Sequence, residues 1–189
     1  MTKPNTREQI IQAALESLLA KSFNAVGVQD ITEAAGVPKG SFYNHFESKE
    51  ALGAEIVTRY GDRGRDILAE TSTPPLERLR RHFERLIARF ADAKFERGCM
   101  LGNFSAELSN QSDMIRDSLG AVYKRWTADI AAAIAEAQKK GAIKNKTKAD
   151  EVAAFLLDSF EGALLRARVE KSRSPFDRFM DVAFNKILT

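Results

Sequence analysis

The chain has 189 residues, with 29 lysine and arginine residues against 26 aspartate and glutamate residues, a net charge of +3. Its hydrophobic fraction of 44% and charged fraction of 29% are ordinary for a globular protein with a sizeable core. Apolar runs are too short for a membrane span and the N-terminus has no signal-peptide core, so we expect no membrane partner. The single cysteine, Cys99, excludes an internal disulfide, so we expect a protein of the reducing cytoplasm.

The charge is unevenly divided along the chain. Residues 1–70 contain 8 Lys and Arg against 10 Asp and Glu, whereas residues 71–189 contain 21 against 16. Charge alone therefore does not indicate nucleic-acid binding by the N-terminal part, where such a contact would depend on a local group of cations and on helix N-termini. The cations of that group are Lys3, Arg7, Lys39 and Lys49.

The hydrophobic spacing predicts an all-α protein of about nine helices. The first predicted helix runs from a cap at Asn5 or Thr6 to about Lys21, with apolar residues on one face. The second begins at Gly27 and carries Asp30 in its first turn, where a carboxylate is favoured by the helix dipole. Both helices are expected to share one small core with the segment that follows.

A sharp turn is predicted at Ala35-Gly36-Val37, because glycine can adopt the positive φ that such a turn requires. Pro38 suits the first turn of the next helix, which we expect over Lys39–Phe46. Its aromatic side chains alternate with polar ones, so one face can be anchored in the core while the other can contact a polymer. Two helices joined in this way are typical of a helix-turn-helix, which binds DNA.

The segment Gln29–Leu52 resembles the DNA-binding region of the tetracycline-repressor (TetR) family of transcriptional regulators. The resemblance covers roughly the first quarter to third of the chain, and it is specific because the turn, the aromatic pair and the next helix cap stand at fixed offsets. The rest of the chain agrees with the family only in length and helical pattern. The matching residues are Ile31, Ala34-Ala35-Gly36-Val37, Gly40, Phe42-Tyr43, His45-Phe46, Ser48-Lys49 and Leu52.

The resemblance also implies which residues would contact DNA. Lysine can donate to guanine and asparagine can pair with adenine, so part of the second helix would face base edges. The base-facing positions are Lys39, Gly40, Ser41 and Asn44. Hydroxyl, imidazole and ammonium groups would donate to phosphates, and the preceding helix would add a contact to the backbone or a flanking base. These positions are Tyr43, His45 and Lys49, with Gln29 for the added contact.

A fourth helix is predicted from a cap at Ser48, and it contains Gly61 and Gly64. Two interpretations of these glycines are open: an exposed weak point in the helix, or a yielding joint between the DNA-binding part and the rest. Thr73-Pro74-Pro75 then interrupts the helical pattern. The expected divisions are a DNA-binding domain over residues 1–50, a connecting helix over 51–72, and a ligand-binding and dimerisation domain over 73–189.

The remaining helices are predicted to have caps at Ser112, Thr147 and Ser174, with an end at Gly141. The last two carry more apolar surface than one contact face needs, which indicates either a subunit interface or a helix buried within a monomer. Since a terminal helix is rarely central in so short a chain, we favour a homodimer through these two helices. Its DNA-binding helices, about 34 Å apart, would enter successive major grooves of a palindromic operator.

The resemblance implies a cavity that admits a small-molecule effector. It would lie among the fifth to eighth predicted helices, which begin at about Leu76, Gly98, Ser112 and Thr147. Binding there would favour a spacing of the DNA-binding helices that does not match the operator. Each candidate has plain core packing as its alternative, because an aromatic at helical spacing is usually core. The candidates are Phe83, Phe90, Cys99, Met100, Phe104, Tyr123, Trp126, Phe155 and Phe160, with Asn103 and Glu107 as polar residues that could orient the ligand.

For Cys99 we favour the role of a small buried hydrophobe. The alternative is a thiol that senses electrophiles or oxidants, because a helix N-terminus and the neighbouring Arg97 would stabilise a thiolate. The Gly98-Cys99 sequence, with Asn103 and Glu107, loosely resembles a branch of the family that responds to such compounds.

Two rival classes of protein are weighed against a regulator. An enzyme is disfavoured because His45 and His82 lack metal-ligand spacing and no phosphate-binding glycine loop, nucleophile elbow or zincin motif is present. A DNA-binding protein that senses nothing would have no need of so large a helical second half. We therefore predict a ligand-responsive transcriptional regulator, with repression as the family's usual mode, and no catalytic residue, metal or cofactor.

Overall fold

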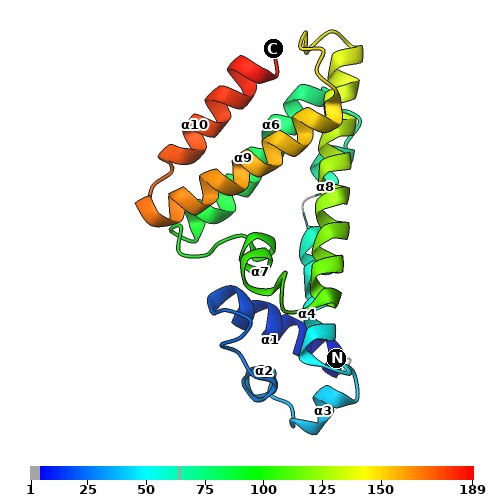
Figure 1. The fold of residues 1–189 in the computed structure, drawn as a ribbon, viewed down its shortest axis with the longest axis vertical. Helices are drawn as coiled ribbons and strands as arrows, with labels where there is room; N and C mark the ends of the chain where they lie inside the picture. Colours follow the sequence, from blue (N-terminus) through cyan, green and yellow to red (C-terminus); the bar gives the residue numbers. More distant parts are fainter. Residues whose placement is uncertain (1–4, 64) are drawn as a thin grey trace. The chain divides into compact units, whose positions relative to one another are not determined.

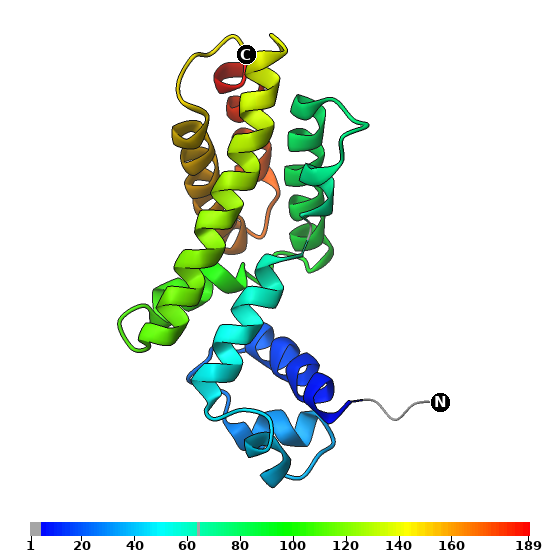
Figure 2. The same ribbon diagram turned by 90° about the vertical axis from the view of Figure 1, so that its right-hand side faces the viewer.

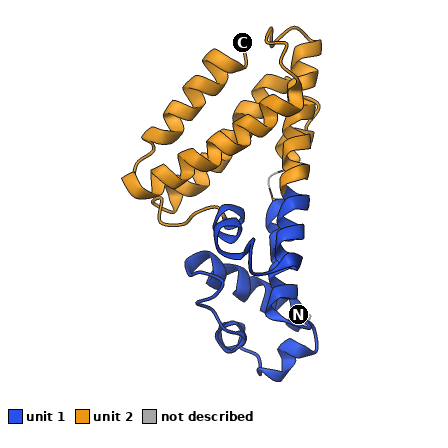
Figure 3. Ribbon diagram, in the orientation of Figure 1, with its two compact units in different colours: residues 1–61, 100–122 blue, residues 62–99, 123–189 orange. Residues whose placement is uncertain are grey.

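The computed structural model describes residues 5–63 and 65–189. Over these residues the regular structure is all helical, as predicted, with ten α-helices and a final π-helical turn (Figures 1 and 2). No helix among them is both long and apolar enough to cross a membrane. The chain divides into two compact units, coloured in Figure 3: residues 1–61 with 100–122, and residues 62–99 with 123–189.

Unit 1 contains the helix-turn-helix and the helices that pack on it. The two units divide after residues 61 and 122, and α7 joins the N-terminal helices because it packs on α4. The helices of unit 1 are α1 (Thr6–Ala20), α2 (Val28–Ala34), α3 (Gly40–Tyr43), α4 (Lys49–Gly61), α7 (Met100–Leu108) and the first part of α8 (Asp113–Lys139).

Local signals set the starts of α1, α2 and α4 as predicted. The side chains of Asn5 and Ser48 accept hydrogen bonds from backbone N–H groups in the first turns of α1 and α4, both at 3.0 Å. At the start of α2, the Gly27 N–H donates to the Asp30 carboxylate at 2.6 Å. Gly36 has φ +67°, so the turn between α2 and α3 uses the left-handed conformation for which glycine was expected.

The core of unit 1 forms where the apolar spacing predicted it. Phe42 and Phe46 are buried and their ring centroids are 5.5 Å apart, so α3 is anchored by its aromatic face. The helix itself is shorter than the predicted Lys39–Phe46 segment, although the Phe46 N–H still donates to the Phe42 carbonyl at 3.0 Å. The buried apolar residues of the first three helices and their loops are Ile10, Ile11, Ala14, Leu15, Leu18, Phe23, Val26, Ile31, Phe42 and Phe46.

Gly61 lies at a close approach between α4 and α8. A Cβ atom at this position would stand 2.4 Å from Cγ1 of Val122, closer than packed atoms can come. Gly61 is buried, so its interpretation as an exposed weak point is wrong: the absent side chain lets two helices touch. The joint remains a prediction, and Gly64 lies outside the described residues.

Unit 2 is built around a cluster of phenylalanine rings. Its helices are α5 (Asp66–Ala69), α6 (Pro75–Asp92), the second part of α8, α9 (Ala149–Glu170), α10 (Ser174–Val182) and the π-helical turn (Ala183–Ile187). α9 and α10 lie side by side and run in opposite directions (Figure 1). Rings from α6, α9, α10 and the final turn meet with centroid separations of 5.0–6.4 Å, and they are Phe83, Phe90, Phe160, Phe176, Phe179 and Phe184.

The helix ends of unit 2 follow the predictions less closely. Gly141 has φ +75° just beyond α8, and the Ser112 hydroxyl accepts the Ile115 N–H at the start of that helix, both as expected. The cap at Thr147 is wrong, because α9 begins after Lys148, which makes no side-chain capping bond. Ser174 is the first residue of α10 and not its cap.

Unit 2 contains a buried charged side chain whose burial the sequence does not predict. Arg78 is 4% exposed and donates to the backbone carbonyls of Leu68 and Glu70, at 3.1 and 2.7 Å, and to the carboxylate of Glu136. It therefore ties α6 to the end of α5 and to α8. Arginine is suited to this because its several N–H donors diverge from one planar group.

The close approach at Gly61 predicts the effect of adding one methyl group. Gly61→Ala should lower the free energy of unfolding by about 1–3 kcal/mol, because the new Cβ overlaps Val122. Gly120→Ala is the matched control, since a Cβ at that helical position meets nothing within 4 Å, and it should be neutral or stabilising. Urea unfolding of both variants checks this, and Gly61→Ala/Val122→Ala should recover part of the loss. Equal stability of the two single variants would contradict the close approach.

Candidate nucleic-acid interface and ligand-binding unit

The predicted base-facing residues lie on the exposed side of α3 and its flanks. Lys39, Gly40 and Asn44 are exposed, and Ser41 is half-buried. Lys39 and Asn44 both have helical backbone conformations, so they extend the short helix by one residue at each end. The polar residues are thus presented together while Phe42 holds the opposite side in the core.

Gly40 has no packing reason to be glycine within its own chain. A Cβ atom there would meet nothing within 4 Å, and Gly40 is not in the positive-φ conformation that favours glycine. A side chain would therefore be tolerated by the fold. The space in front of Gly40 is available for close approach by another molecule.

The residues predicted to contact phosphate differ in their surroundings. Tyr43 is 58% exposed although its ring packs edge-on against Phe42, with centroids 5.2 Å apart. His45 is exposed at the end of α3. Gln29 is exposed on α2, where its amide donates to Glu33 at 2.6 Å. Hydroxyl, imidazole and amide groups therefore lie on the accessible surface of the helix-turn-helix.

Lys49 has a structural role that the sequence does not reveal. Its ammonium group donates to the backbone carbonyls of Phe23 and Val26, both at 3.1 Å, and lies 4.3 Å from the centroid of the Phe23 ring. An ammonium has three donors, so these two carbonyls take up two of them. Lys49 holds the loop between α1 and α2 whatever its role on DNA.

Glu107 holds the same loop from α7. Its carboxylate accepts the backbone N–H groups of Phe23 and Asn24 at 3.0 and 2.8 Å. Glu107, a candidate from the sequence for orienting a ligand, therefore makes a structural contact inside unit 1. Gln111, one turn later, accepts from the Asn24 side-chain amide at 3.1 Å.

Arg7, one of the predicted group of cations, forms ion pairs within unit 1. It pairs with Glu55, and Arg59 bridges Glu8 and Glu55, so four charges link α1 to α4. The Arg7 guanidinium also lies 5.0 Å from the Phe46 ring centroid. Hydrogen bonding by Arg59 holds the pKa of the Glu8 carboxyl below its ordinary value. The remaining cations for a polymer are Lys39 on α3 and Lys49, while Lys3 lies outside the described residues.

The predicted effector-binding residues fall into separate groups. Phe83, Phe90 and Phe160 are buried in the aromatic cluster of unit 2, and Tyr123 and Trp126 are half-buried on α8, edge-on with centroids 6.4 Å apart. Two of the predicted residues, Met100 and Phe104, lie instead in unit 1, where both are buried on α7. The prediction did not separate these groups, because spacing along a helix does not say which neighbour the helix packs on.

Comparison with known proteins decides the family. Residues 10–56 match the family of bacterial regulatory proteins called tetR, and residues 75–183 match the C-terminal domain described as tetracyclin repressor-like. The second match alone spans more than half of the chain. The chain belongs to the TetR family.

Full-length relatives agree with this assignment. The chain is 38% identical to the HTH-type transcriptional repressor DhaR of Mycobacterium sp. strain GP1, over all of this chain and 95% of that protein. It is 34% identical to the transcriptional regulator AcuR of Cereibacter sphaeroides, over 91% and 80% respectively. The crystal structure of regulatory protein TetR from Rhodobacter sphaeroides, 32% identical, superposes with a TM-score of 0.86 over 95% of this chain and 97% of that one. This TetR-family chain is a ligand-responsive, DNA-binding transcriptional regulator and not an enzyme.

Cys99 of this TetR-family chain is buried, as favoured from the sequence. It precedes α7 and forms a hydrogen bond with Glu161 on α9. Burial raises the pKa of the Glu161 carboxyl, and the hydrogen bond with Cys99 opposes that rise. A buried thiol beside a carboxyl group differs from the exposed, electropositive surroundings in which reactive thiolates are found.

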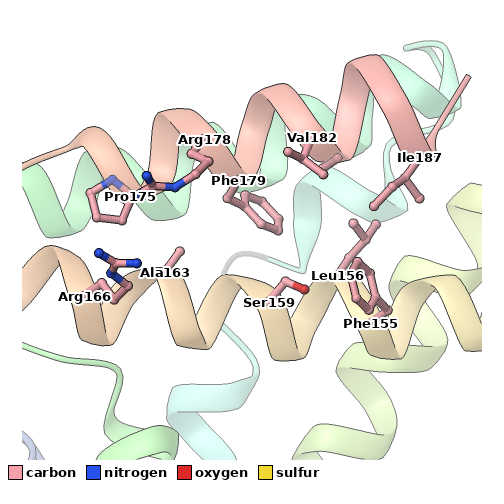
Figure 4. Close-up of a pocket in the computed structure, with 11 residues that line it drawn as sticks. Phe155, Leu156, Ser159, Ala163, Arg166, Pro175, Arg178, Phe179, Val182 and Ile187 are labelled. Atoms are coloured by element: carbon pink, nitrogen blue, oxygen red, sulfur yellow. The ribbon is translucent and has the colours of Figure 1, made fainter.

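α9 and α10 form an apolar groove on the outside of unit 2 (Figure 4). Phe155, 54% exposed, lies at one end with Ile187, and Arg166 and Arg178 lie at the other. Phe155 is thus placed away from the buried ring cluster with which it was grouped from the sequence. Val182 on α10 is also exposed and lines the groove.

The two carbonyl contacts of Lys49 predict a loss of stability when its charge is removed. Lys49→Met keeps the length of the side chain but removes the ammonium, so the free energy of unfolding should fall by about 1–3 kcal/mol. Lys39→Met, at an exposed position on the same domain, should change it by no more than about 0.5 kcal/mol. Urea unfolding monitored by circular dichroism measures both, and a Lys49→Met variant as stable as Lys39→Met would rule out the structural role.

Proposed function

We propose that this regulator represses transcription by binding a palindromic operator as a homodimer, and that a small molecule bound in unit 2 releases it. The observation that carries the proposal is the alternation along α3 and the turn that follows it: Phe42 and Phe46 are buried and anchor the segment, and the exposed residues between them are polar. Such a helix can enter a major groove without losing its own core. The DhaR relative, whose name describes it as a repressor, supports the direction of control.

In this proposal the roles on DNA divide between base edges and phosphates. Lys39, Ser41 and Asn44 face bases, and the open space at Gly40 lets the backbone approach them. Tyr43, His45 and Lys49 contact phosphates, with Gln29 as the flanking contact. Lys49 then acts twice, because its third N–H can reach a phosphate while the other two hold the loop.

The dimer is proposed to form through α9 and α10. Of the large apolar side chains that are clearly exposed among the described residues, most lie on these two helices, and Val169 is 85% exposed. The other exposed apolar side chains of these two helices are Phe155, Leu165 and Val182. A second copy of the same surface would cover them by two-fold symmetry, which is the commonest arrangement for a soluble homo-oligomer.

The effector is proposed to bind without forming a covalent bond. The candidate lining residues of unit 2 are Phe83, Phe90, Tyr123, Trp126 and Phe160, whose rings offer apolar and edge-on contacts to a small organic molecule. The thiol-sensing alternative through Cys99 is less well supported, because its thiol is buried beside Glu161.

The division of roles predicts two kinds of DNA-binding defect. Asn44→Ala should reduce discrimination at one operator position by about 1–3 kcal/mol, because one adenine-specific pair of hydrogen bonds is lost. Tyr43→Phe should weaken binding to operator and scrambled duplex alike, because a phosphate contact carries no sequence information. An operator selected from a random DNA pool, and single-base variants of it, supply the duplexes for the titrations. Identical behaviour of the two variants across those duplexes would defeat this assignment.

The exposed apolar surface predicts how the dimer can be broken. Phe155→Asp/Val182→Asp should give monomers in sedimentation at micromolar concentration, because two copies would bury uncompensated carboxylates. Met114→Asp is the control, since Met114 is also an exposed large apolar residue, but on α8 in unit 1, and it should leave the dimer intact. The double variant should also lose its preference for palindromes over half-sites. A wild-type chain that sediments as a monomer would remove the basis of the proposal.

A further inference from the structure

A cationic hollow of about 380 Å³ lies beside α6 in unit 2. Arg63 lines it from the connection that follows α4, and His82, Arg85, Leu86 and Arg89 line it from α6. The lining residues bring three guanidinium groups and an imidazole together and include no carboxylate. This hollow is separate from the ring cluster, which uses other residues of α6.

The sequence of α6 places these side chains on one face. His82, Arg85 and Arg89 follow each other at spacings of three and four residues, which aligns them along a helix. Phe83 and Phe90 point instead into the core, where both are buried. The helix thus supplies an apolar face for folding and a second face that is cationic.

Contacts with α6 hold the segment that follows Arg63. α5 follows it and packs on α6, and Asp66 at the start of α5 pairs with Arg85 at 3.0 Å. Arg78 further secures the end of α5 through the carbonyls of Leu68 and Glu70. The hollow therefore has walls that are held by contacts within unit 2.

Asp66 is one acidic neighbour of the hollow, and it pairs with Arg85. Its hydrogen bond with Arg85 holds the pKa of the Asp66 carboxyl below its ordinary value, so Asp66 is an anion at neutral pH. Asp66 is not among the residues that line the hollow. An anion entering the hollow would compete with Asp66 for Arg85 and with the existing contacts of Arg63 and Arg89.

We propose that this hollow binds a small organic molecule through a phosphate group. Guanidinium groups match the oxygens of a phosphate with paired hydrogen bonds, and two or more of them suit a dianion better than a monoanion. The volume lies in the range of small-molecule sites, and Leu86 gives the rest of the ligand one apolar contact. The proposal concerns ligand binding alone and does not depend on the operator or dimer described above.

Inorganic pyrophosphate is a suitable probe, titrated calorimetrically into the full-length protein. We expect saturable binding of one pyrophosphate per chain, weakened about tenfold or more by Arg63→Gln or Arg89→Gln, since each removes a charge-assisted contact. Asp66→Asn should change the affinity in the opposite direction, tightening it several-fold because Arg85 loses its competing partner. Arg173→Gln is the matched control, at an exposed arginine on another helix end, and should bind as the wild type does.

Two results would overturn the proposal. One is pyrophosphate binding that is absent, or that Arg173→Gln weakens as much as Arg89→Gln does, because the charge of the whole chain would then explain it. The other is a result showing that the phosphates of DNA, and not those of a small molecule, occupy the hollow. If Arg63→Gln/Arg89→Gln lowered the salt dependence of non-specific duplex binding by about two, the hollow would contact DNA. We expect that slope to remain at its wild-type value.

Discussion

The loop between α1 and α2 is held by two side chains of opposite charge, Glu107 and Lys49. The arrangement of unit 1 depends on these contacts. Glu107 accepts the N–H groups of Phe23 and Asn24, while Lys49 donates to the carbonyls of Phe23 and Val26. Hydrogen bonds to charged groups contribute about 1.5–3 kcal/mol each, more than the 0–1 kcal/mol of an exposed ion pair. The loop therefore links the helix-turn-helix to α4 and α7, while the ion pairs of Arg7, Glu8, Glu55 and Arg59 link α1 to α4.

Unit 2 resolves a question that the apolar pattern of α9 and α10 raised. A helix that is apolar on two sides has to bury both. One side is accounted for inside the chain, where Phe160, Phe176 and Phe179 pack with the rings of α6. The other side, which carries Phe155 and Val182, remains at the surface of the single chain. This is why a second copy is the occupant we propose for the α9–α10 groove.

The features that could be predicted from the sequence are those that depend on near neighbours along the chain. The turn at Gly36 and the cap at Ser48 are confirmed because a positive φ or a capping bond involves residues at most a few positions apart. The partners of Lys49 lie 26 and 23 residues away, and those of Glu107 lie 84 and 83 away, so no local spacing encodes them. The buried Arg78 was likewise indistinguishable from the exposed arginines of α6.

The alternation along α3 separates what the fold requires from what the surface presents. Phe42 and Phe46 are fixed by packing, whereas Lys39, Tyr43 and Asn44 make up no part of the core. The exposed positions can thus be exchanged among polar residues at little expense to stability. If these residues contact the operator as proposed, a few substitutions in a duplicated gene would direct the protein to a different promoter while the fold stays stable.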